Sequence, residues 1–209
     1  MNGKLLRFPP SDPAVQAAAS PVEPAAGSNL SDEALVSACG TGDSAALGEL
    51  FDRFHQTVYR FLSRYLGPRN PDIDDLVQIT FLEARRAAPR FRKESAVKSW
   101  IVGIALNVAR HYVRSETRRR AFLRSGELHQ DSMGGTPEST TAHNEFLQRL
   151  QQSILELPEH LRTVFVICEL EGVSGTEAAR LLNLREGTLW RRLHDARKLI
   201  RKCFERGTA

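Results

Sequence analysis

The chain has 209 residues with a formal net charge of +4, which is enough length for one or two modest domains. Its three cysteines, Cys39, Cys168 and Cys203, are too far apart in the sequence to suggest a disulfide framework or a zinc site. The longest apolar run, near residues 100–109, is too short to span a bilayer, and no apolar signal-peptide core follows the first residues, so we expect a reduced, cytoplasmic protein without membrane insertion.

The positive charge is concentrated in two separate blocks. Residues 110–124 contain six arginines and one glutamate, and residues 185–206 contain eight lysines or arginines and three acidic residues, so each block has a net charge of +5. Two separate basic blocks indicate two contact surfaces for a polyanion.

Residues 1–28 are rich in Pro and Ala, and we interpret them as a disordered tail. The folded part begins at Ser31, which resembles a helix N-cap because two acidic residues follow it. A long amphipathic helix is predicted over residues 44–66, and Gly67–Pro68 ends it. Its apolar stripe, which we interpret as core, consists of Leu47, Leu50, Phe51, Phe54, Val58, Phe61, Leu62 and Tyr65.

Residues 72–88 form the next predicted helix. Its inward-facing residues are Ile73, Leu76, Val77 and Phe81. The outer side is acidic and polar, with Asp72, Asp74, Asp75, Gln78 and Glu83. Acidic residues in a first turn stabilise the helix dipole, which explains them without a ligand. A metal site built from these carboxylates is the weaker alternative, because no histidine completes it.

A basic loop containing an aromatic residue, residues 89–96, precedes a helix predicted over residues 97–120. Its apolar side carries Trp100, Ile101, Ile104, Ala105, Val108 and Tyr112. Its far end carries many arginines, which repel one another, and a phosphate backbone would relieve that repulsion. Aromatic residues interleaved with cations are typical of single-stranded DNA binding. Core packing is the alternative role for each aromatic residue alone.

A polar segment, residues 125–141, reads as a flexible linker. A helix is predicted over residues 142–157, followed by another over residues 159–169 that contains Val164, Phe165 and Cys168. The first of these has Phe146, Leu147, Leu150, Ile154 and Leu155 facing inward.

The C-terminal stretch has the pattern of a helix-turn-helix. A short helix is predicted over residues 176–182, a turn at Asn183–Leu184, and a basic helix from about Glu186. The apolar positions of the basic helix are Leu189, Leu193, Ala196, Ile200 and Cys203. The opposite side carries Thr188, Arg191, His194, Asp195, Lys198 and Lys202, flanked by Arg192 and Arg197. Such a helix binds in a DNA major groove; the alternative is a solvated basic face.

At these residues the chain resembles bacterial sigma factors. LPEHLRTVFVICELEGVSGTEAARLLNLREGTLWRRLHDARK resembles their promoter-binding region 4, and DDLVQITFLEARRAAPRF followed by KSWIVGIALNVARHYVRSETRRR resembles their region 2. The two-domain plan is similar to the extracytoplasmic-function (ECF) group of the sigma-70 family. The resemblance implies an all-α protein of two small helical domains, residues 29–124 and 142–209, joined by the linker, with no enzymatic activity and no cofactor or metal.

The resemblance also implies partners and binding residues. The partners are core RNA polymerase (β′ clamp and β flap), promoter DNA and an anti-sigma factor. Polymerase would bind Asp74, Asp75, Gln78 and Phe81. The −10 element would bind Phe91, Arg92, Lys93, Trp100, Asn107, Arg110, Arg114 and Arg118. The −35 element would bind Arg185, Thr188, Trp190, Arg191, Arg192, His194, Asp195 and Lys198. Melting would follow from tighter binding of the single-stranded form, without ATP hydrolysis.

Some positions depart from the family pattern. Asn183 stands where the family often has Gly, Arg191 where Ser is common, and Trp190 and Asp195 where basic residues are usual. Aspartate accepts a hydrogen bond from cytosine but repels phosphate. We therefore hypothesise that this chain reads a −35 box of its own.

The linker constrains the arrangement of the two domains. Fully extended, its 17 residues reach about 55–60 Å, but as a free coil they span only about 20–25 Å. Two promoter elements more than one DNA turn apart, at about 34–36 Å per turn, therefore need an extended linker, and polymerase is the natural scaffold for it. Without polymerase, we expect the domains to fold together and to bind DNA weakly.

Two other functions compete with this interpretation. A plain two-domain regulator would bind duplex DNA without polymerase, but it would not need the acidic helix or the aromatic basic loop. A metal-dependent nuclease would use Asp72, Asp74, Asp75 and Glu83, but these carboxylates have no histidine or lysine partner nearby in the sequence.

Overall fold

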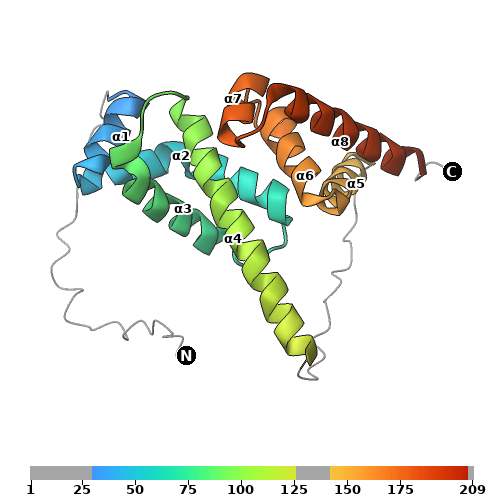
Figure 1. Cartoon of the computed structure of the whole chain (residues 1–209). Coiled ribbons are helices and arrows are strands. Elements are labelled where there is room, and N and C mark those ends of the chain that lie inside the picture. The colour runs from blue at the N-terminus through green and yellow to red at the C-terminus, as the bar shows by residue number, and fades with distance from the viewer. Residues whose placement is uncertain (1–29, 126–141, 207–209) are drawn as a thin grey trace. The chain divides into compact units, whose positions relative to one another are not determined.

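The computed structural model describes residues 30–125 and 142–206, and all regular secondary structure in these residues is helical (Figure 1). The predicted all-α fold class is confirmed. The tail and nearly all of the predicted linker lie outside the described residues. The helices are α1 (Asp32–Gly40), α2 (Ser44–Leu66), α3 (Ile73–Ala87), η2 (Ala88–Arg90), α4 (Val97–Ser125), α5 (Ala142–Glu156), α6 (Glu159–Phe165), η3 (Val166–Leu170), α7 (Gly175–Leu181) and α8 (Glu186–Arg206).

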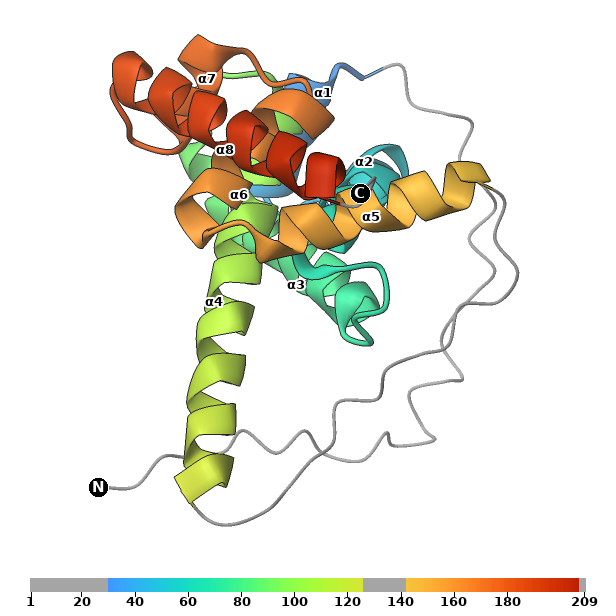
Figure 2. The ribbon, with the colours of Figure 1, turned by 90° about the vertical axis from the view of Figure 1, so that its right-hand side faces the viewer.

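Helices α1 to α4 form one packed group in which α2 contacts each of the other three. Leu50, Phe61 and Leu62 of the predicted α2 stripe are fully buried. The carboxylate of Asp43 accepts hydrogen bonds from two amides in the first turn of α2, and Ser31 caps α1 as predicted. Amphipathic spacing and local capping thus explain the helices of this group. Helix α4 extends beyond the other three helices (Figures 1 and 2).

Helices α5 to α8 form the second group, in which α8 packs on α5, α6 and α7. The predicted apolar positions Leu189, Leu193 and Ala196 are buried. Asn183 has φ of +51°, so it makes the left-handed corner that the sequence predicts between α7 and α8. The amide of Leu184 closes this turn by donating to the carbonyl of Ala179 at 2.8 Å.

The helix predicted as continuous over residues 159–169 is not uniform. It is α-helical only to Phe165, and η3 then continues as a π-helix, which is the wider turn with hydrogen bonds between residues five apart. The amide of Glu171 donates to the carbonyl of Val166 at 3.0 Å in this pattern. Val166 and Ile167 of this segment are both buried, as are Val164 and Phe165 before it.

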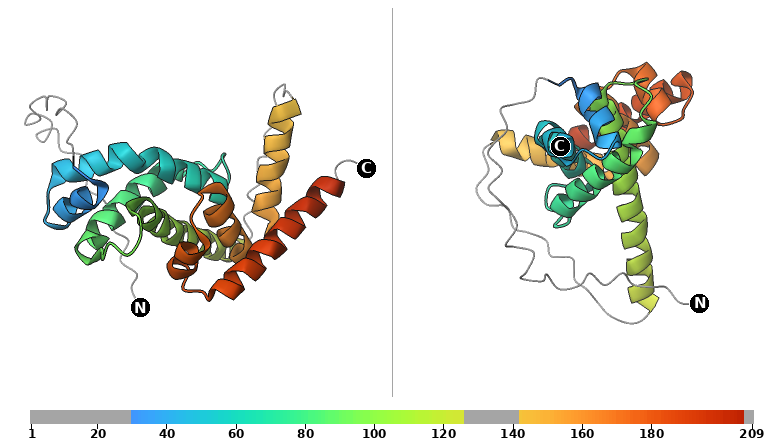
Figure 3. Two further views of the ribbon diagram at one scale, coloured as in Figure 1. Left: turned by 90° about the horizontal axis from the view of Figure 1, so that it is seen from above. Right: turned by 90° about the vertical axis from the view of Figure 1, so that its left-hand side faces the viewer.

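The predicted inward position of Phe146 and Leu147 on α5 is wrong. Phe146 and Leu147 are 52% and 47% exposed, whereas Ile154, about two helical turns further along α5, is buried. The first half of α5 extends away from α6 and α8, as Figure 3 shows in the view from above. The buried residues of α5, Ser153 and Ile154, therefore lie in its second half.

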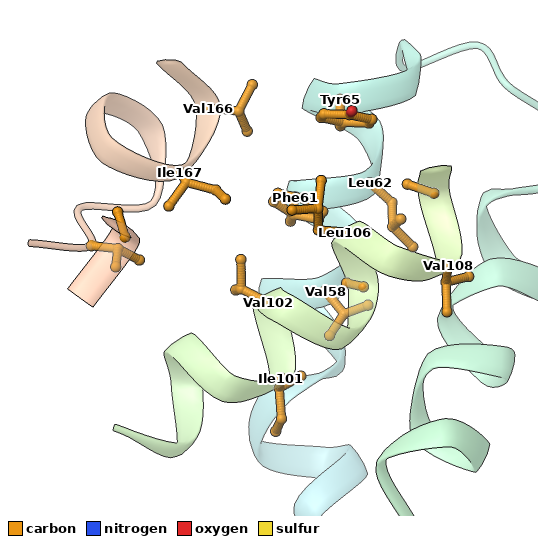
Figure 4. Close-up of a cluster of buried hydrophobic side chains, with 14 of the residues drawn as sticks. Val58, Phe61, Leu62, Tyr65, Ile101, Val102, Leu106, Val108, Val166 and Ile167 are labelled. Carbon is orange, nitrogen blue, oxygen red and sulfur yellow. The ribbon is translucent and has the colours of Figure 1, made fainter. Parts of the chain in front are cut away.

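The two groups of helices share one core. α4 contacts α7, and α2 contacts both α5 and η3. Figure 4 shows Phe61 and Tyr65 of α2 with Leu106 of α4 on one side of this core and Ile167 of η3 on the other. The buried hydroxyls of Tyr65 and Thr163 are 3.1 Å apart and hydrogen-bonded. The described chain without polymerase thus has its two helical groups packed together.

Candidate nucleic-acid interface

Helix α8 presents polar side chains on the side away from its buried stripe. This surface, which we call the α8 face, consists of Arg191, His194, Asp195 and Lys198, all exposed. Thr188 and Arg192 are partly buried at its edges. Arg185 is exposed just before the helix, and its carbonyl accepts hydrogen bonds from the amides of Thr188 and Leu189. The residues predicted for −35 binding therefore share one helix and its start.

Trp190 lies beside the α8 face and against α7. A Cβ atom at Gly175 would be only 2.3 Å from the Trp190 ring, so the glycine allows the indole to pack closely on the start of α7. The side chain is nonetheless 51% exposed. Trp190 therefore connects the two helices of the motif and still presents its outer edge to solvent.

Arg197, which flanks the α8 face, forms an ion pair. Its guanidinium donates hydrogen bonds to the carboxylate of Glu169. This pair joins α8 to η3. It reduces the positive charge beside the α8 face, because the two side chains neutralise each other.

The loop between η2 and α4 carries the first predicted −10 residues. The rings of Phe91 and Trp100 are tilted by 46° with their centroids 5.0 Å apart, and both are half-buried. Arg92 and Lys93 are exposed, and Lys93 turns the loop with φ of +57°. The aromatic pair therefore anchors a loop whose cations point into solvent.

Helix α4 carries the remaining residues predicted for −10 binding along one side. Trp100, Asn107, Arg110 and Arg114 recur at helical spacing, and we call this side the α4 face. Asn107 and Arg114 are exposed, as is Arg118 one turn further on. Arg110 is partly buried because its Nε donates to Glu159 of α6 at 3.1 Å.

The arginine-rich end of α4 has its own counter-charge. Glu116 accepts a two-pronged hydrogen bond from Arg119 and lies 4.0 Å from Arg120. Repulsion within this end is therefore partly relieved inside the helix, in addition to any relief that phosphate would bring.

The predicted polymerase residues on α3 are divided by burial. Asp74, Asp75 and Gln78 are exposed, but Phe81 is only 4% exposed. The Phe81 ring packs against that of Phe51 with centroids 4.9 Å apart. In this conformation Phe81 is a core residue.

Two exposed apolar residues on α3 were missed by the sequence analysis. Ile79 and Leu82 are 43% and 53% exposed, next to the acidic residues. They fall outside the buried stripe that contains Leu76, Thr80 and Ala84. Apolar residues off the buried stripe of a helix are the sequence feature that could have predicted their exposure.

The carboxylates of the nuclease alternative have structural partners. Asp72 accepts from the hydroxyl of Tyr112 at 2.7 Å, and Glu83 pairs with Arg86. Burial, followed by the hydrogen bond to Asp72, raises the pKa of Tyr112. Within the part of the chain that the structure describes, no group of three or more His, Cys, Asp or Glu residues is placed to hold a metal ion.

Two family models match the chain: Sigma-70 region 2 over residues 50–119 and Sigma-70, region 4 over residues 147–200. A relative from Haemophilus influenzae, described as an ECF RNA polymerase sigma-E factor, is 34% identical over 179 residues, which cover 82% of this chain and 94% of the relative. The chain belongs to the ECF sigma factors. A relative of the same description from Escherichia coli K12 is 32% identical and covers 82% of this chain and 93% of its own length.

Two solved structures have a fold similar to that of this chain. CnrH in complex with the cytosolic domain of CnrY is 25% identical, with a TM-score of 0.60 and coverage of 83% of this chain and 97% of that one. The sigma factor RpoE of Bartonella quintana, in complex with the anti-sigma factor NepR, is 20% identical, with a TM-score of 0.60 and coverage of 76% and 96%.

In this ECF sigma factor we use region 2 for the group α1–α4 and region 4 for the group α5–α8. Sigma factors are transcription initiation factors rather than enzymes. None of the helices in residues 30–125 and 142–206 combines the length and apolar character needed to cross a membrane.

Proposed function

We propose that this sigma factor binds core RNA polymerase, reads a −35 element with α8 and a −10 element with α4, and helps to melt the promoter. The observation that carries the proposal is the presence of two cationic surfaces on two rigid helices, one in each family region. Rigid helices suit recognition because they hold side chains in fixed register against a groove or strand.

The α8 face supports duplex recognition. Arg191 and Lys198 are long, exposed cations that can contact phosphates or the edge of guanine in a major groove. His194 and Asp195 between them can donate to and accept from base edges. The buried stripe on the opposite side fixes the rotation of α8, so these side chains would enter the groove together.

The α4 face and the preceding loop support binding of a single strand. Phe91 and Trp100 offer aromatic surfaces beside Arg92 and Lys93, a combination on which bases can stack while cations neutralise the backbone. Asn107 can hydrogen-bond to base edges. Binding energy gained only from the separated strand would favour melting without a nucleotide cofactor, because it offsets part of the unstacking cost.

The outer side of α3 supports polymerase binding. Asp75 and Gln78 lie one helical turn before the exposed apolar residues Ile79 and Leu82, which places polar side chains beside an apolar patch, as is common at protein interfaces. Asp74 is exposed on the same helix. An open groove between α3 and α4, lined by Ile79 and Asn107, adjoins this patch. We assign this side of region 2 to the β′ clamp and assign region 4 to the β flap.

An anti-sigma factor is a further proposed partner. The similar structure of RpoE is a complex with an anti-sigma factor, and that of CnrH is a complex with CnrY. An inhibitor that covers the exposed patch on α3 would compete with polymerase for it.

The proposed −35 specificity can be tested at Asp195. Changing Asp195→Arg replaces an acceptor by a donor on the α8 face, so the preferred −35 box should change in a selection from randomised promoters. Lys202→Ala, further along α8, is the control and should keep the original box. An unchanged box in Asp195→Arg would show that Asp195 does not read a base.

Run-off transcription tests the proposed function as a whole. Bacterial core polymerase is assayed with and without this chain on a pool of promoter fragments. We expect specific new transcripts that require the chain, and their start sites would reveal the two boxes. Duplex binding without any transcript would instead favour a plain regulator, and magnesium-dependent cleavage would favour a nuclease.

A further inference from the structure

An open groove of about 870 Å³ lies between the loop that joins α2 to α3, the second half of α4, and helix α5. Pockets that bind small molecules have volumes of about 300–1,000 Å³, so this groove has room for a ligand of nucleotide size. Its described lining includes none of the residues proposed to bind the −10 element, the −35 element or polymerase. The groove therefore needs an explanation of its own.

Direct contacts fix the loop to the helices on both sides of the groove. Gly67 of the loop has φ of +103°, and a Cβ atom there would be only 3.3 Å from Cδ1 of Leu155 on α5. The side-chain amide of Gln151 on α5 donates to the carbonyl of Arg64 at 3.0 Å. On the other side, the hydroxyl of Tyr112 on α4 donates to the Asp72 carboxylate. These contacts hold the walls of the groove in place.

Four arginines from the three segments line the groove. They are Arg69 of the loop, Arg119 and Arg120 of α4, and Arg149 of α5, and all four are exposed. A guanidinium presents its N–H donors in a planar fork that matches two oxygens of one phosphate, which makes arginine well suited to phosphate recognition. Because these arginines come from three segments, they can contact several phosphates of one ligand from different sides.

Two carboxylates also line the groove, and each has a partner. Asp72 accepts from Tyr112, and Glu116 accepts two hydrogen bonds from Arg119 and lies 4.0 Å from Arg120. Four arginines and two carboxylates give the lining a formal net charge of +2. A guanidinium has more N–H donors than the two that Glu116 engages, so Arg119 retains donors for a second anion. The groove therefore favours a ligand with several negative charges.

The remaining lining suits a nucleobase. Amide side chains include Gln148, which is exposed on α5 and can hydrogen-bond to the polar edge of a base. Bases stack on aromatic or apolar side chains, and such stacking does not depend on the identity of the base. The apolar and aromatic residues of the lining are Leu66, Pro68, Pro71, Tyr112 and Leu155.

We propose that this groove binds a nucleoside polyphosphate, with the phosphates on the arginines and the base on the apolar side chains. The ligand contacts the loop and α4 of region 2 together with α5 of region 4, so its binding stabilises the folded chain by mass action. This inference goes beyond the proposed function and does not depend on it, because the groove is separate from the surfaces assigned to promoter DNA and polymerase.

The test uses the full chain and three probes: ATP, inorganic tripolyphosphate and adenosine. Affinity is measured by calorimetry, and the position of the ligand by NMR shifts of the Gly67 and Asn70 amides. The variant Arg120→Gln/Arg149→Gln removes one groove arginine from each region. The control Arg86→Gln/Arg201→Gln removes the same charge from the same two regions, at exposed residues outside the described lining of the groove.

We expect ATP to bind more tightly than tripolyphosphate or adenosine, to shift the Gly67 and Asn70 amides, and to raise the melting temperature. Arg120→Gln/Arg149→Gln should weaken ATP binding by about tenfold or more, because charged hydrogen bonds are lost, whereas the control should bind like the unmodified chain.

Three results would overturn the proposal. Equal weakening in the two variants would show that ATP is attracted by the overall positive charge of the chain. ATP binding that leaves the Gly67 and Asn70 amides unshifted would place the ligand elsewhere. Equal affinities for tripolyphosphate and ATP would show that the groove does not bind the nucleoside.

Discussion

Glu171 is an acidic side chain that the fold removes almost entirely from water. Its side chain is 5% exposed, and its carboxylate is paired with Arg64 of α2. A buried carboxylate is tolerated only when a cation or several donors satisfy it. The residue therefore depends on region 2 although it belongs to region 4.

We predict that Arg64→Ala lowers the free energy of unfolding by about 1–3 kcal/mol, because Glu171 keeps its burial and loses a charged hydrogen-bond partner. Arg86→Ala is the control, since its pair with Glu83 is exposed and should contribute under about 1 kcal/mol. Urea denaturation followed by circular dichroism measures both. Equal losses in the two variants would contradict the prediction.

Cys168 should react slowly with alkylating reagents. Burial raises the pKa of its thiol from 9.0 to about 11, so the thiolate fraction at pH 8 is about a hundredfold lower than for an ordinary cysteine. Iodoacetamide labelling of Cys168, followed by mass spectrometry, should therefore accelerate with pH up to about 11. The same peptide in urea is the reference and should label readily at pH 8.

The sign of the corresponding stability effect follows from this raised pKa. Below pH 9 the thiol is neutral in both states, and its contribution to folding is fully present. Between pH 9 and about 11 the unfolded state loses the proton more readily, so this stabilisation is lost as the pH rises. Slow labelling at pH 8 and a lower free energy of unfolding near pH 11 both follow from the raised pKa of Cys168.

At the scale of elements, the turn between α7 and α8 can be tested at Asn183. Its φ of +51° is a conformation that costs most L-residues about 1–2 kcal/mol, less for Asn and least for Gly. Asn183→Ala should therefore reduce stability by about 1 kcal/mol, whereas Asn183→Gly should be nearly neutral. Thermal unfolding of the two variants distinguishes them, and equal melting temperatures would contradict this account.

Strong periodicity made the long elements predictable from the sequence. The stripe of α2 and the spacing of Leu189, Leu193 and Ala196 on α8 each fit one helical face. These residues are buried, except that Leu47 and Phe51 of α2 are partly buried against the core. Phe146 and Leu147 fit a stripe equally well but are exposed, because periodicity says which residues share a face and not whether a neighbour covers it. The π-turn at η3 was also missed, since it departs from the period that identifies a helix.

The candidate binding residues were predictable to a similar degree. Exposure of Arg191 and Asp195 follows from their position opposite the apolar stripe of α8. Burial of Phe81, and the contact of Trp190 with Gly175, depend on residues distant in sequence or on backbone spacing. Such contacts become visible only when the helices are packed together.

At the scale of the molecule, regions 2 and 4 share a core and should unfold together. The two tryptophans report on this separately, because Trp100 belongs to region 2 and Trp190 to region 4. We predict that Trp190→Phe, which retains Trp100, and Trp100→Phe, which retains Trp190, each give a fluorescence transition in urea that coincides with circular dichroism of the same variant. Two separate transitions would show that the shared core does not couple the regions.

Gly103 carries a consequence for how such a chain can evolve. A glycine inside a helix costs about 1 kcal/mol relative to alanine, so Gly103→Ala should make α4 itself more stable. The same methyl group would meet Cδ1 of Leu181 at 2.3 Å, so the Leu181 side chain would have to leave its present contact with α4. Selection for a more stable α4 and selection for the present contact between α4 and α7 therefore act in opposite directions at Gly103. Drift toward alanine there would stabilise α4 and disturb its contact with Leu181.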